Sequence, residues 1–300
     1  MNLQKKWVMV VIAIFCALLW GSAFPALKLS YSELGIPSTG IAEQMWLAGL
    51  RFLFAGLVVL IGLLLIKRSA LQLTRRQYGI LLIFGIVQTT LQYLFFYVGV
   101  SNTSGVQSSI IISSNTFFTI LLAHFIYAND RLGWQKWVGL AAGFTGIFFA
   151  NWGQSFDGSF QFLGEGFLLL SALTSAIGTI MAKEMGKGIH PFTLSGWQLT
   201  LGAILLLITS FPFADTGSLT WTPLAIGLLI YMVALSAIAF ALWFAILQYH
   251  KASHVGIYKF FVPVSGVGLS VLLLPGEPFT WPILVALVFV AFGIYSVNRS

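Results

Sequence analysis

The stretch Asp130-Arg131-Leu132-Gly133-Trp134, which leads through an apolar run to Phe149-Ala150-Asn151, has a second copy in the chain. This copy begins at Glu277-Pro278-Phe279-Thr280-Trp281 and ends at Tyr295-Ser296-Val297-Asn298. In both copies an acid, an aromatic residue four positions later, a Gly-Ile pair and an asparagine recur at one offset of 147 residues (277 − 130 and 298 − 151). An offset near half of the 300 residues predicts a protein built from two related halves.

The composition predicts a polytopic membrane protein. The chain is 58% hydrophobic and only 8% charged, with a mean hydropathy of +0.94. Soluble domains carry about 25% charged residues, so this chain cannot cover itself with a water-soluble surface. Backbone groups in lipid must be satisfied within each segment, and a spanning helix needs about 20 apolar residues. We therefore expect an all-α fold with about ten transmembrane helices.

Ten apolar segments divide into two sets of five, joined by a polar turn. The predicted spans are 7–28, 43–66, 78–100, 105–127, 134–151, 164–185, 192–213, 223–249, 254–274 and 281–298. The first five-helix repeat is expected over residues 1–151 and the second over residues 164–298. The connections are short, and none is long enough to hold a further domain.

The distribution of charge predicts the orientation. With the N-terminus in the cytoplasm, 12 of the 15 basic residues lie at the inner face and six of the eight acids at the outer face. This asymmetry follows the positive-inside rule, and it predicts that both termini are cytoplasmic. Five is an odd number, so the second repeat enters the membrane from the opposite side. Inverted repeats give two packings of similar energy that open to opposite sides, which is the basis of alternating access.

Several motifs resemble the EamA-type ten-helix branch of the drug/metabolite transporter superfamily. The motifs are Trp20-Gly21-Ser22-Ala23-Phe24 with Lys28, Leu50-Arg51-Phe52, Asn129-Asp130-Arg131-Leu132, Gly276-Glu277 and Pro263. Two features depart from the family pattern: Asn115-Thr116 replaces a proline of the fourth span, and the acid that follows this span is Asp130 rather than a glutamate.

The resemblance implies both an architecture and a type of activity. Spans one to four and six to nine are expected to surround a central cavity, with spans five and ten at the periphery. It also implies export or exchange of small metabolites, often amino acids or related compounds. It specifies neither the substrate nor the direction of transport.

Two basic residues fall within predicted spans. Arg51 lies inside the second span, where a charge costs a few kcal/mol unless it is paired or hydrated. It could attract a substrate carboxylate, or it could pair with helix carbonyls. Lys259 precedes Pro263 by one turn, and the proline leaves the carbonyl of Lys259 without its helical donor. Lys259 could belong to an anion or proton site, or its long side chain could extend to the inner interface.

Uncharged polar residues are disfavoured against lipid and are expected to face inward. The candidates for substrate binding are Gln88, Gln92, Asn115, Thr179 and Gln198. Amides offer both donors and acceptors to a zwitterionic ligand. The alternative is that these side chains join helices, since an interhelical hydrogen bond contributes about 0.6 kcal/mol.

Aromatic residues deep in the spans form a third group of candidates. Most of the aromatic residues are expected at span ends or against lipid. The deeper ones, which could form the walls of a substrate cavity or simply pack the core, are Trp20, Phe24, Tyr93, Trp243 and Tyr258.

The sequence points away from catalysis. All eight acids lie at predicted span ends or in loops, no nucleophile has an evident base, and no cluster has metal-ligand spacing. A phosphate-binding loop of the GxxxxGK[ST] type is absent as well. We therefore predict no enzyme activity, no cofactor, no metal and no nucleic-acid partner.

The predicted function is secondary transport in the inner or plasma membrane, with a small polar metabolite such as an amino acid exported by alternating access. One alternative is a multidrug or lipid-like efflux protein, and another is a non-transporting membrane receptor or scaffold. The expected partners are the small-molecule substrate and the lipid bilayer, and the sequence leaves a homo-oligomer open.

Overall fold

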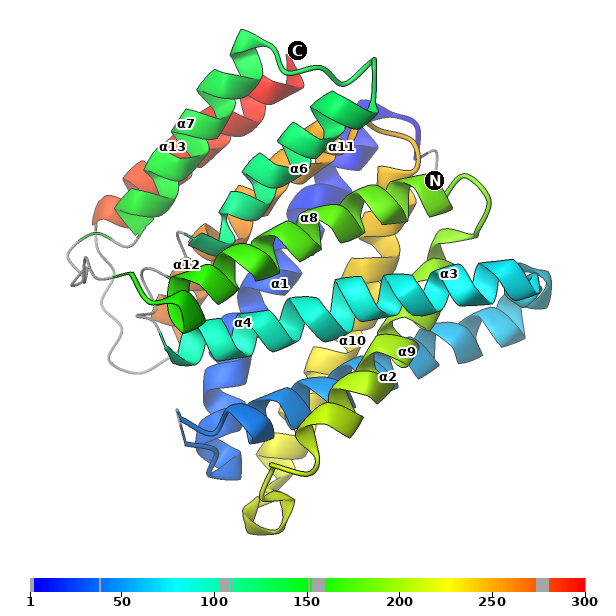
Figure 1. Cartoon of the computed structure of the whole chain (residues 1–300). Coiled ribbons are helices and arrows are strands. Elements are labelled where there is room, and N and C mark those ends of the chain that lie inside the picture. Colours follow the sequence, from blue (N-terminus) through cyan, green and yellow to red (C-terminus); the bar gives the residue numbers. More distant parts are fainter. Residues whose placement is uncertain are drawn as a thin grey trace.

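Figure 1 shows the computed structural model of the chain, which describes residues 3–37, 39–102, 108, 111–150, 152, 160–273 and 281–299. All regular secondary structure in these ranges is helical, and none of the described residues lies in a strand. The predicted all-α class is therefore confirmed.

The helical segments follow the ten predicted spans. Those of the first half are α1 (Lys6–Leu34), α2 (Ile41–Ile66), α3 (Arg75–Gly85) continued by η2 (Ile86–Leu91) and α4 (Gln92–Ser101), α6 (Ser114–Ile126) and α7 (Trp134–Ala150). Those of the second half are η3 (Phe162–Gly166) continued by α8 (Phe167–Met185), α9 (Pro191–Ser210), α10 (Pro223–Leu247), α11 (Ala252–Gly256) continued by η5 (Ile257–Phe260) and α12 (Phe261–Leu273), and α13 (Trp281–Asn298). Eight of these segments are long and apolar enough to cross a membrane, and α6 is a shorter apolar helix.

The end of the first helix differs from the prediction. Helix α1 runs six residues beyond the predicted end at residue 28 and stops where Gly35 adopts a left-handed conformation with φ 72°. Lys28 therefore lies inside the helix rather than at its end. Helix α6 is described from Ser114, and the predicted start of this span at residue 105 lies outside the described residues. The predicted turn residues Gly276 and Glu277, and Asn151 of the first repeat copy, lie outside the described residues.

Helix pairing follows the two-halves pattern. Helix α1 packs against α10 and α12, and in the same way α8, the first helix of the second half, packs against α4 and α6. Helix α2 pairs with its counterpart α9, and α7 pairs with its counterpart α13. Each of these contacts joins one half to the other, and each has an equivalent when the two halves are exchanged. This pairing is what a pair of related repeats produces.

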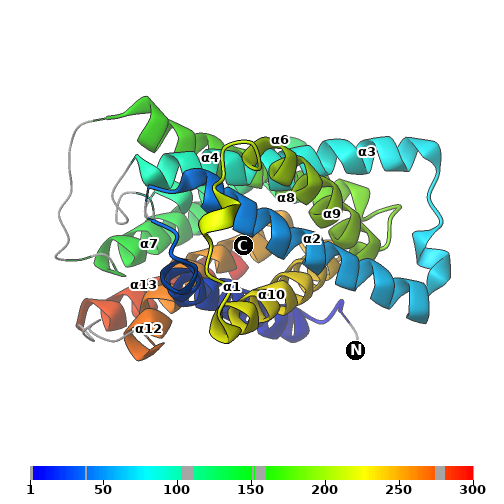
Figure 2. The same ribbon diagram turned by 90° about the horizontal axis from the view of Figure 1, so that it is seen from below.

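The bundle has two layers of helices with a pair at each end. Figure 2 shows α3, α4, α6 and α8 along one side and α1, α10 and α12 along the other. Helices α2 and α9 join the layers at one end, through contacts of α2 with α10 and of α9 with α3. The pair α7–α13 lies at the edge of the bundle, as Figure 1 shows, and contacts α12. This is the peripheral position expected for spans five and ten.

Small residues allow the peripheral pair to pack closely. A Cβ atom added to Gly139 would lie 2.8 Å from the carbonyl oxygen of Gly293, and one added to Gly293 would lie 2.7 Å from the carbonyl oxygen of Gly139. Helices in membranes associate through such close backbone approaches, because lipid removes the hydrophobic drive for association. A larger side chain at either glycine would force the two helices apart.

Two spans are interrupted near the middle of the bundle. In span three, η2 is a π-helical turn, and in span nine, η5 is a 3-10 turn that ends three residues before Pro263. Turns of these kinds within helices are frequent at functional sites, since they free backbone groups and redirect side chains. Gln88 lies in the first interruption and Lys259 in the second.

Candidate functional site

Arg51 is buried within the bundle and is held by polar and aromatic neighbours. It lies ten residues after the start of α2, roughly 15 Å along the helix. Its Nε donates to Ser236 Oγ of α10 at 2.7 Å, and its guanidinium lies 4.8 Å from the ring centre of Phe52. The partner is therefore a serine hydroxyl on another helix rather than a backbone carbonyl. A hydroxyl leaves the positive charge of Arg51 uncompensated.

Lys259 also points into the bundle. Its Nζ donates to Thr179 Oγ1 of α8 at 3.2 Å and lies 5.7 Å from the ring centre of Trp243 of α10. The hydroxyl of Thr179 donates in turn to the carbonyl of Ser175 at 2.9 Å, so it can only accept from the ammonium. This geometry joins three helical segments around one cation. It is not the geometry of a lysine extended to the interface.

Four aromatic rings form a continuous path between the two cations. The centroid distances along this path are 5.1 Å for Trp243–Trp20, 5.4 Å for Trp20–Phe240 and 6.3 Å for Phe240–Phe52. Tyr93 adds a fifth ring, 4.5 Å from Phe52. The path draws on α1, α2, α4 and α10, so it crosses both halves of the chain. A cation lies at each end of this row of apolar rings, a combination that suits a ligand with a charged group and an apolar body.

Several buried polar atoms near this path have no hydrogen-bond partner in the described protein. They include Trp20 Nε1, Gln88 Oε1, Asn115 Oδ1 and Thr119 Oγ1. Unpaired buried polar groups cost about 1–3 kcal/mol each. Groups that remain unpaired within the protein are suited to bind a ligand or water.

Gln88 lies beside the Lys259 site, and Asn115 contacts α8 roughly two turns away from it. The Gln88 side chain lies against Gly178, where an added Cβ would clash with its amide, and Gly178 directly precedes Thr179. Its Nε2 donates to Gln92 Oε1 at 2.8 Å, which leaves Oε1 of Gln88 free. Asn115 Nδ2 donates to the carbonyl of Ala172 in α8 at 3.2 Å. The amide side chains of Gln88 in η2 and Asn115 in α6 thus both contact α8. Thr179 of the same helix accepts the hydrogen bond from Lys259.

Three predicted site residues lie apart from this group. Phe24 is 47% exposed and its ring lies against Gly266 of α12. Tyr258 points toward α13, where its hydroxyl accepts from Asn298 Nδ2 at 3.4 Å. Gln198 Oε1 accepts from Thr89 Oγ1 at 2.7 Å and so joins α9 to η2. These three side chains stay candidates on sequence grounds only.

Sequence reasoning missed three members of the aromatic and cationic group. Phe52 belongs to the motif Leu50-Arg51-Phe52 but was not among the predicted site residues, and nothing local distinguishes Phe240 from other apolar residues of its span. Ser236 had a signal, because it is the only serine or threonine in Pro223–Leu247. A lone hydroxyl in an apolar helix marks the face that meets a polar partner.

A second charged cluster lies at one end of the bundle. Asp130 and Lys136 are each 1% exposed and form an ion pair with Lys136 Nζ 2.5 Å from Asp130 Oδ1. Ser253 at the start of α11 donates to Asp130 through its hydroxyl and through its backbone N–H at 3.1 Å. Lys136 also donates to the carbonyl of Arg131 at 2.8 Å. This cluster ties the loop between α6 and α7 to span nine, and hence one half to the other.

The hydrogen bonds determine the ionisation of Asp130. Burial alone would raise the pKa of Asp130, but hydrogen bonds from Lys136 and Ser253 outweigh burial and lower the pKa below its ordinary value of 3.8. The carboxylate is therefore charged whenever the protein is folded near neutral pH. In the sequence, Lys136 reads only as one more basic residue at the inner face, and its role here depends on tertiary contact.

Comparisons with known proteins identify the class. The chain matches the EamA-like transporter family twice, over residues 7–152 and over residues 162–299. The chain belongs to this family and is a multi-pass membrane transporter. The two matched segments are the two halves that the internal offset predicts.

Relatives extend the comparison over the full length. The uncharacterized transporter YoaV of Bacillus subtilis is 27% identical over 93% of this chain and 92% of its own length. The uncharacterized transporter YvbV of the same organism is also 27% identical, over 95% of this chain and 90% of its own length. A solved crystal structure that is 16% identical superposes with a TM-score of 0.80 over 98% of both chains, which establishes the shared fold.

Proposed function

We propose that this transporter exports small polar or amphipathic metabolites, such as amino acids, by alternating access. In this proposal residues 1–151 and 164–298 are the two inverted repeats, and the substrate site lies between Arg51 and Lys259. The protein would reside in the inner or plasma membrane with both termini in the cytoplasm. The excess of basic residues at one set of span ends supports this orientation.

One observation carries the proposal: the buried Arg51 and the partly buried Lys259 lie at the two ends of a row of aromatic rings that both halves of the chain build. Neither cation has a carboxylate partner among the residues that the structure describes. A substrate carboxylate could compensate the charge of Arg51 or Lys259. The free amide oxygens of Gln88 and Asn115 could then accept from a substrate ammonium group.

The aromatic path also favours a second candidate, the efflux of larger apolar cations or lipid-like compounds. Trp20, Phe240 and Trp243 offer ring faces that bind apolar groups without requiring a carboxylate. The two candidates differ in their need for the buried cations. A drug-like substrate would tolerate neutral residues at positions 51 and 259, whereas an amino acid would not.

Uptake into inside-out membrane vesicles tests the proposal. A panel of labelled amino acids and related metabolites is supplied with and without an imposed proton gradient. Wild type is compared with Lys259→Gln, with Lys259→Arg, and with Lys187→Gln as a control, because Lys187 is an exposed lysine that is 66% accessible. Folding of each variant is checked by size exclusion in detergent.

Saturable uptake of one class by wild type, lost in Lys259→Gln and retained in Lys187→Gln, would support the amino-acid site. Saturable uptake of a cationic dye that both Arg51→Gln and Lys259→Gln preserve would favour the efflux alternative. Uptake by folded wild type that does not exceed that of empty vesicles for any compound would count against both. Dependence on the proton gradient would distinguish coupled transport from exchange or facilitated diffusion.

A further inference from the structure

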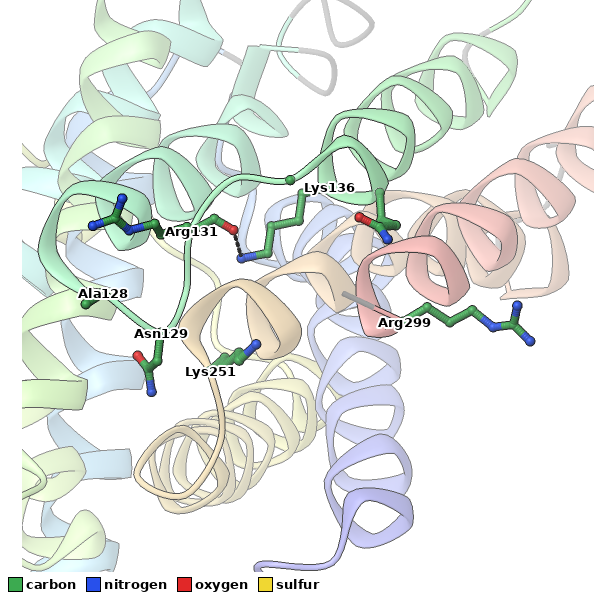
Figure 3. A pocket seen from close by; sticks show the side chains of 8 residues that line it. Ala128, Asn129, Arg131, Lys136, Lys251 and Arg299 are labelled. Atoms are coloured by element: carbon green, nitrogen blue, oxygen red, sulfur yellow. Dashed lines mark hydrogen bonds between the residues drawn. The ribbon is translucent and has the colours of Figure 1, made fainter.

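A hollow at one end of the bundle is lined by several polar and basic residues. It lies where the loop from α6 to α7, the residue before α11 and the end of α13 meet, and its volume is about 400 Å³. Its basic lining residues are Arg131, Lys136, Lys251 and Arg299. Figure 3 shows Arg131 and Arg299 at opposite sides of the hollow with Lys251 between the two residues, and the two guanidinium groups extend away from each other.

Among the described residues, the charge of this hollow is only partly compensated. Lys136 is neutralised by Asp130, which is buried behind the wall. Among the described residues, Arg131, Lys251 and Arg299 have no carboxylate within ion-pair distance, and no acid lines the hollow. Three basic residues without a described carboxylate partner therefore line one hollow. Such an arrangement attracts a group with one or two negative charges and several acceptor oxygens, which is the chemistry of a phosphate.

A second hollow adjoins the first and is more apolar. Arg299 lines both, and the second continues between α1 and α13 along Val10, Ala291 and Ile294. Near its polar end Asn298 has a buried amide oxygen without a hydrogen-bond partner in the described protein. A basic head region thus continues into an apolar groove. This order of chemistry matches a lipid, with its phosphate first and its acyl chain next.

The same helices present aromatic residues at the expected level of the membrane interface. Trp134, at the start of α7, is 70% exposed, and Tyr295 of α13 is 53% exposed with Arg299 over its ring at 4.6 Å. Tryptophan and tyrosine concentrate where headgroups meet acyl chains. The hollow therefore lies at headgroup depth, on the side to which the charge pattern assigns the cytoplasm.

We propose that the two hollows form one binding site for an anionic phospholipid of the cytoplasmic leaflet. Its phosphate would lie among Arg131, Lys251 and Arg299, and an acyl chain would follow the groove between α1 and α13. A headgroup hydroxyl, as in phosphatidylglycerol, could donate to the free amide oxygen of Asn298. A soluble phosphate compound shares the head chemistry but would leave the apolar groove unfilled. The site is separate from the path between Arg51 and Lys259 and does not rest on the proposed function.

Native mass spectrometry of the purified full-length protein in mild detergent can test this site. Phosphatidylglycerol and phosphatidylcholine with identical acyl chains are titrated in turn, and glycerol phosphate is added as a soluble competitor. The test variant is the triple substitution Arg131→Gln/Lys251→Gln/Arg299→Gln. The matched control is Arg68→Gln/Arg75→Gln/Arg76→Gln, which removes the same charge at the same predicted face from exposed positions outside both hollows.

For wild type we expect phosphatidylglycerol to bind at least about ten-fold more tightly than phosphatidylcholine, because each basic residue near the headgroup adds to the attraction. The test variant should lose this preference and the control should keep it. A second pair, Ile294→Trp and the outward-facing Val288→Trp, tests the groove, and only Ile294→Trp should weaken binding.

Three results would overturn the proposal. The first is an equal affinity of wild type for the two lipids. The second is an equal loss of preference in the test and control triple variants, which would reduce the effect to net charge. The third is displacement of phosphatidylglycerol by an equal concentration of glycerol phosphate, which would make the site one for soluble phosphates. Because the readout is binding, a failure here is distinguishable from a failure of transport.

Discussion

Two charged regions of this transporter differ in how far their charged groups are paired within the protein. At the end of the bundle, both oxygens of Asp130 accept hydrogen bonds, and Lys136 is paired with Asp130 and with the carbonyl of Arg131. Along the aromatic path, Arg51 and Lys259 each donate to a single hydroxyl. In the first region the two charges compensate each other without a ligand. In the second region neither charge has a counter-charge among the described residues, and several buried acceptors have no partner there, so a ligand or water could bind to them.

The number of hydrogen-bond partners, rather than the depth of burial, indicates whether a charged side chain stabilises the fold or is available to a ligand. Lys136 is among the most deeply buried side chains, yet its charge is already compensated by Asp130. Lys259 is less deeply buried but has ammonium donors left over, since Thr179 is its only described acceptor. A fully paired charge stabilises a contact between the halves. A half-paired charge beside unpaired amides is available for binding.

The largest expected effect is a loss of stability when the buried ion pair between Asp130 and Lys136 is broken. Asp130→Asn leaves the buried ammonium of Lys136 without a counter-charge, and removing one partner of a buried pair costs about 3–5 kcal/mol. Unfolding in mixed micelles with increasing SDS would measure this loss. The control is Glu184→Gln, whose partner Lys187 is exposed, and it should cost less than about 1 kcal/mol. Equal unfolding midpoints for wild type and Asp130→Asn would contradict a structural role.

Acid should weaken the same region in wild type. The pKa of Asp130 is lower in the folded protein than its ordinary 3.8. Its stabilising contribution is therefore fully present above pH 3.8, and it is lost as the pH falls through the lower folded pKa. The difference in unfolding midpoint between wild type and Asp130→Asn should shrink between pH 5 and the most acid accessible pH. A difference that stays constant over this range would mean that another group stabilises the contact.

Substitution of Lys259, which has no described counter-charge, should change the transport rate rather than the stability. Lys259→Gln keeps a hydrogen-bond donor for Thr179 but removes the charge, so we expect at least about a ten-fold loss in kcat/KM for an anionic or zwitterionic substrate, which equals about 1.4 kcal/mol. The SDS midpoint should change little or rise, because a buried unpaired charge is removed. Wild-type transport rates in a folded Lys259→Gln protein would remove this residue from the site.

The smallest effect is expected at the hydroxyl that holds Arg51. Ser236→Ala removes one hydrogen bond to a charged group, which contributes about 1.5–3 kcal/mol when fully buried and less where substrate or water replaces it. We expect KM to change a few-fold with little change in kcat, because the guanidinium keeps its charge and loses only its orientation. Ser22→Ala, which removes a partly exposed hydroxyl of α1, serves as the control. An unchanged KM would show that Ser236 does not orient Arg51 for binding.

The architecture was largely predictable because it depends on the solvent. Lipid forces each apolar segment into a helix, so the ten spans follow from hydropathy alone. The repeat offset predicted the two halves that the family match covers separately. Helix ends were harder to predict. The continuation of α1 to Leu34 depends on the left-handed turn at Gly35, and the sequence before it contains no signal to stop at residue 28.

The candidate site was predictable in part. Charge and polarity identified Arg51, Lys259, Gln88 and Asn115, since such residues are costly in lipid wherever they point. Their pairing was not predictable. The contact of Arg51 with Ser236 joins residues 185 positions apart, and that of Lys259 with Thr179 joins residues 80 positions apart.

The sequence by itself determined the membrane environment, the helical class, the repeat and the residue types that lipid would not tolerate. These follow from transfer free energies, which each segment carries wherever it lies in the fold. Only the tertiary structure decided which charged side chains are paired with a counter-charge and which have none among the described residues. In the sequence, Asp130 lies just after the fourth predicted span and Lys259 lies within the ninth, and neither position reveals its hydrogen-bond partners. Their roles diverge because hydrogen-bond partners come from distant helices, and packing, not composition, brings those helices together.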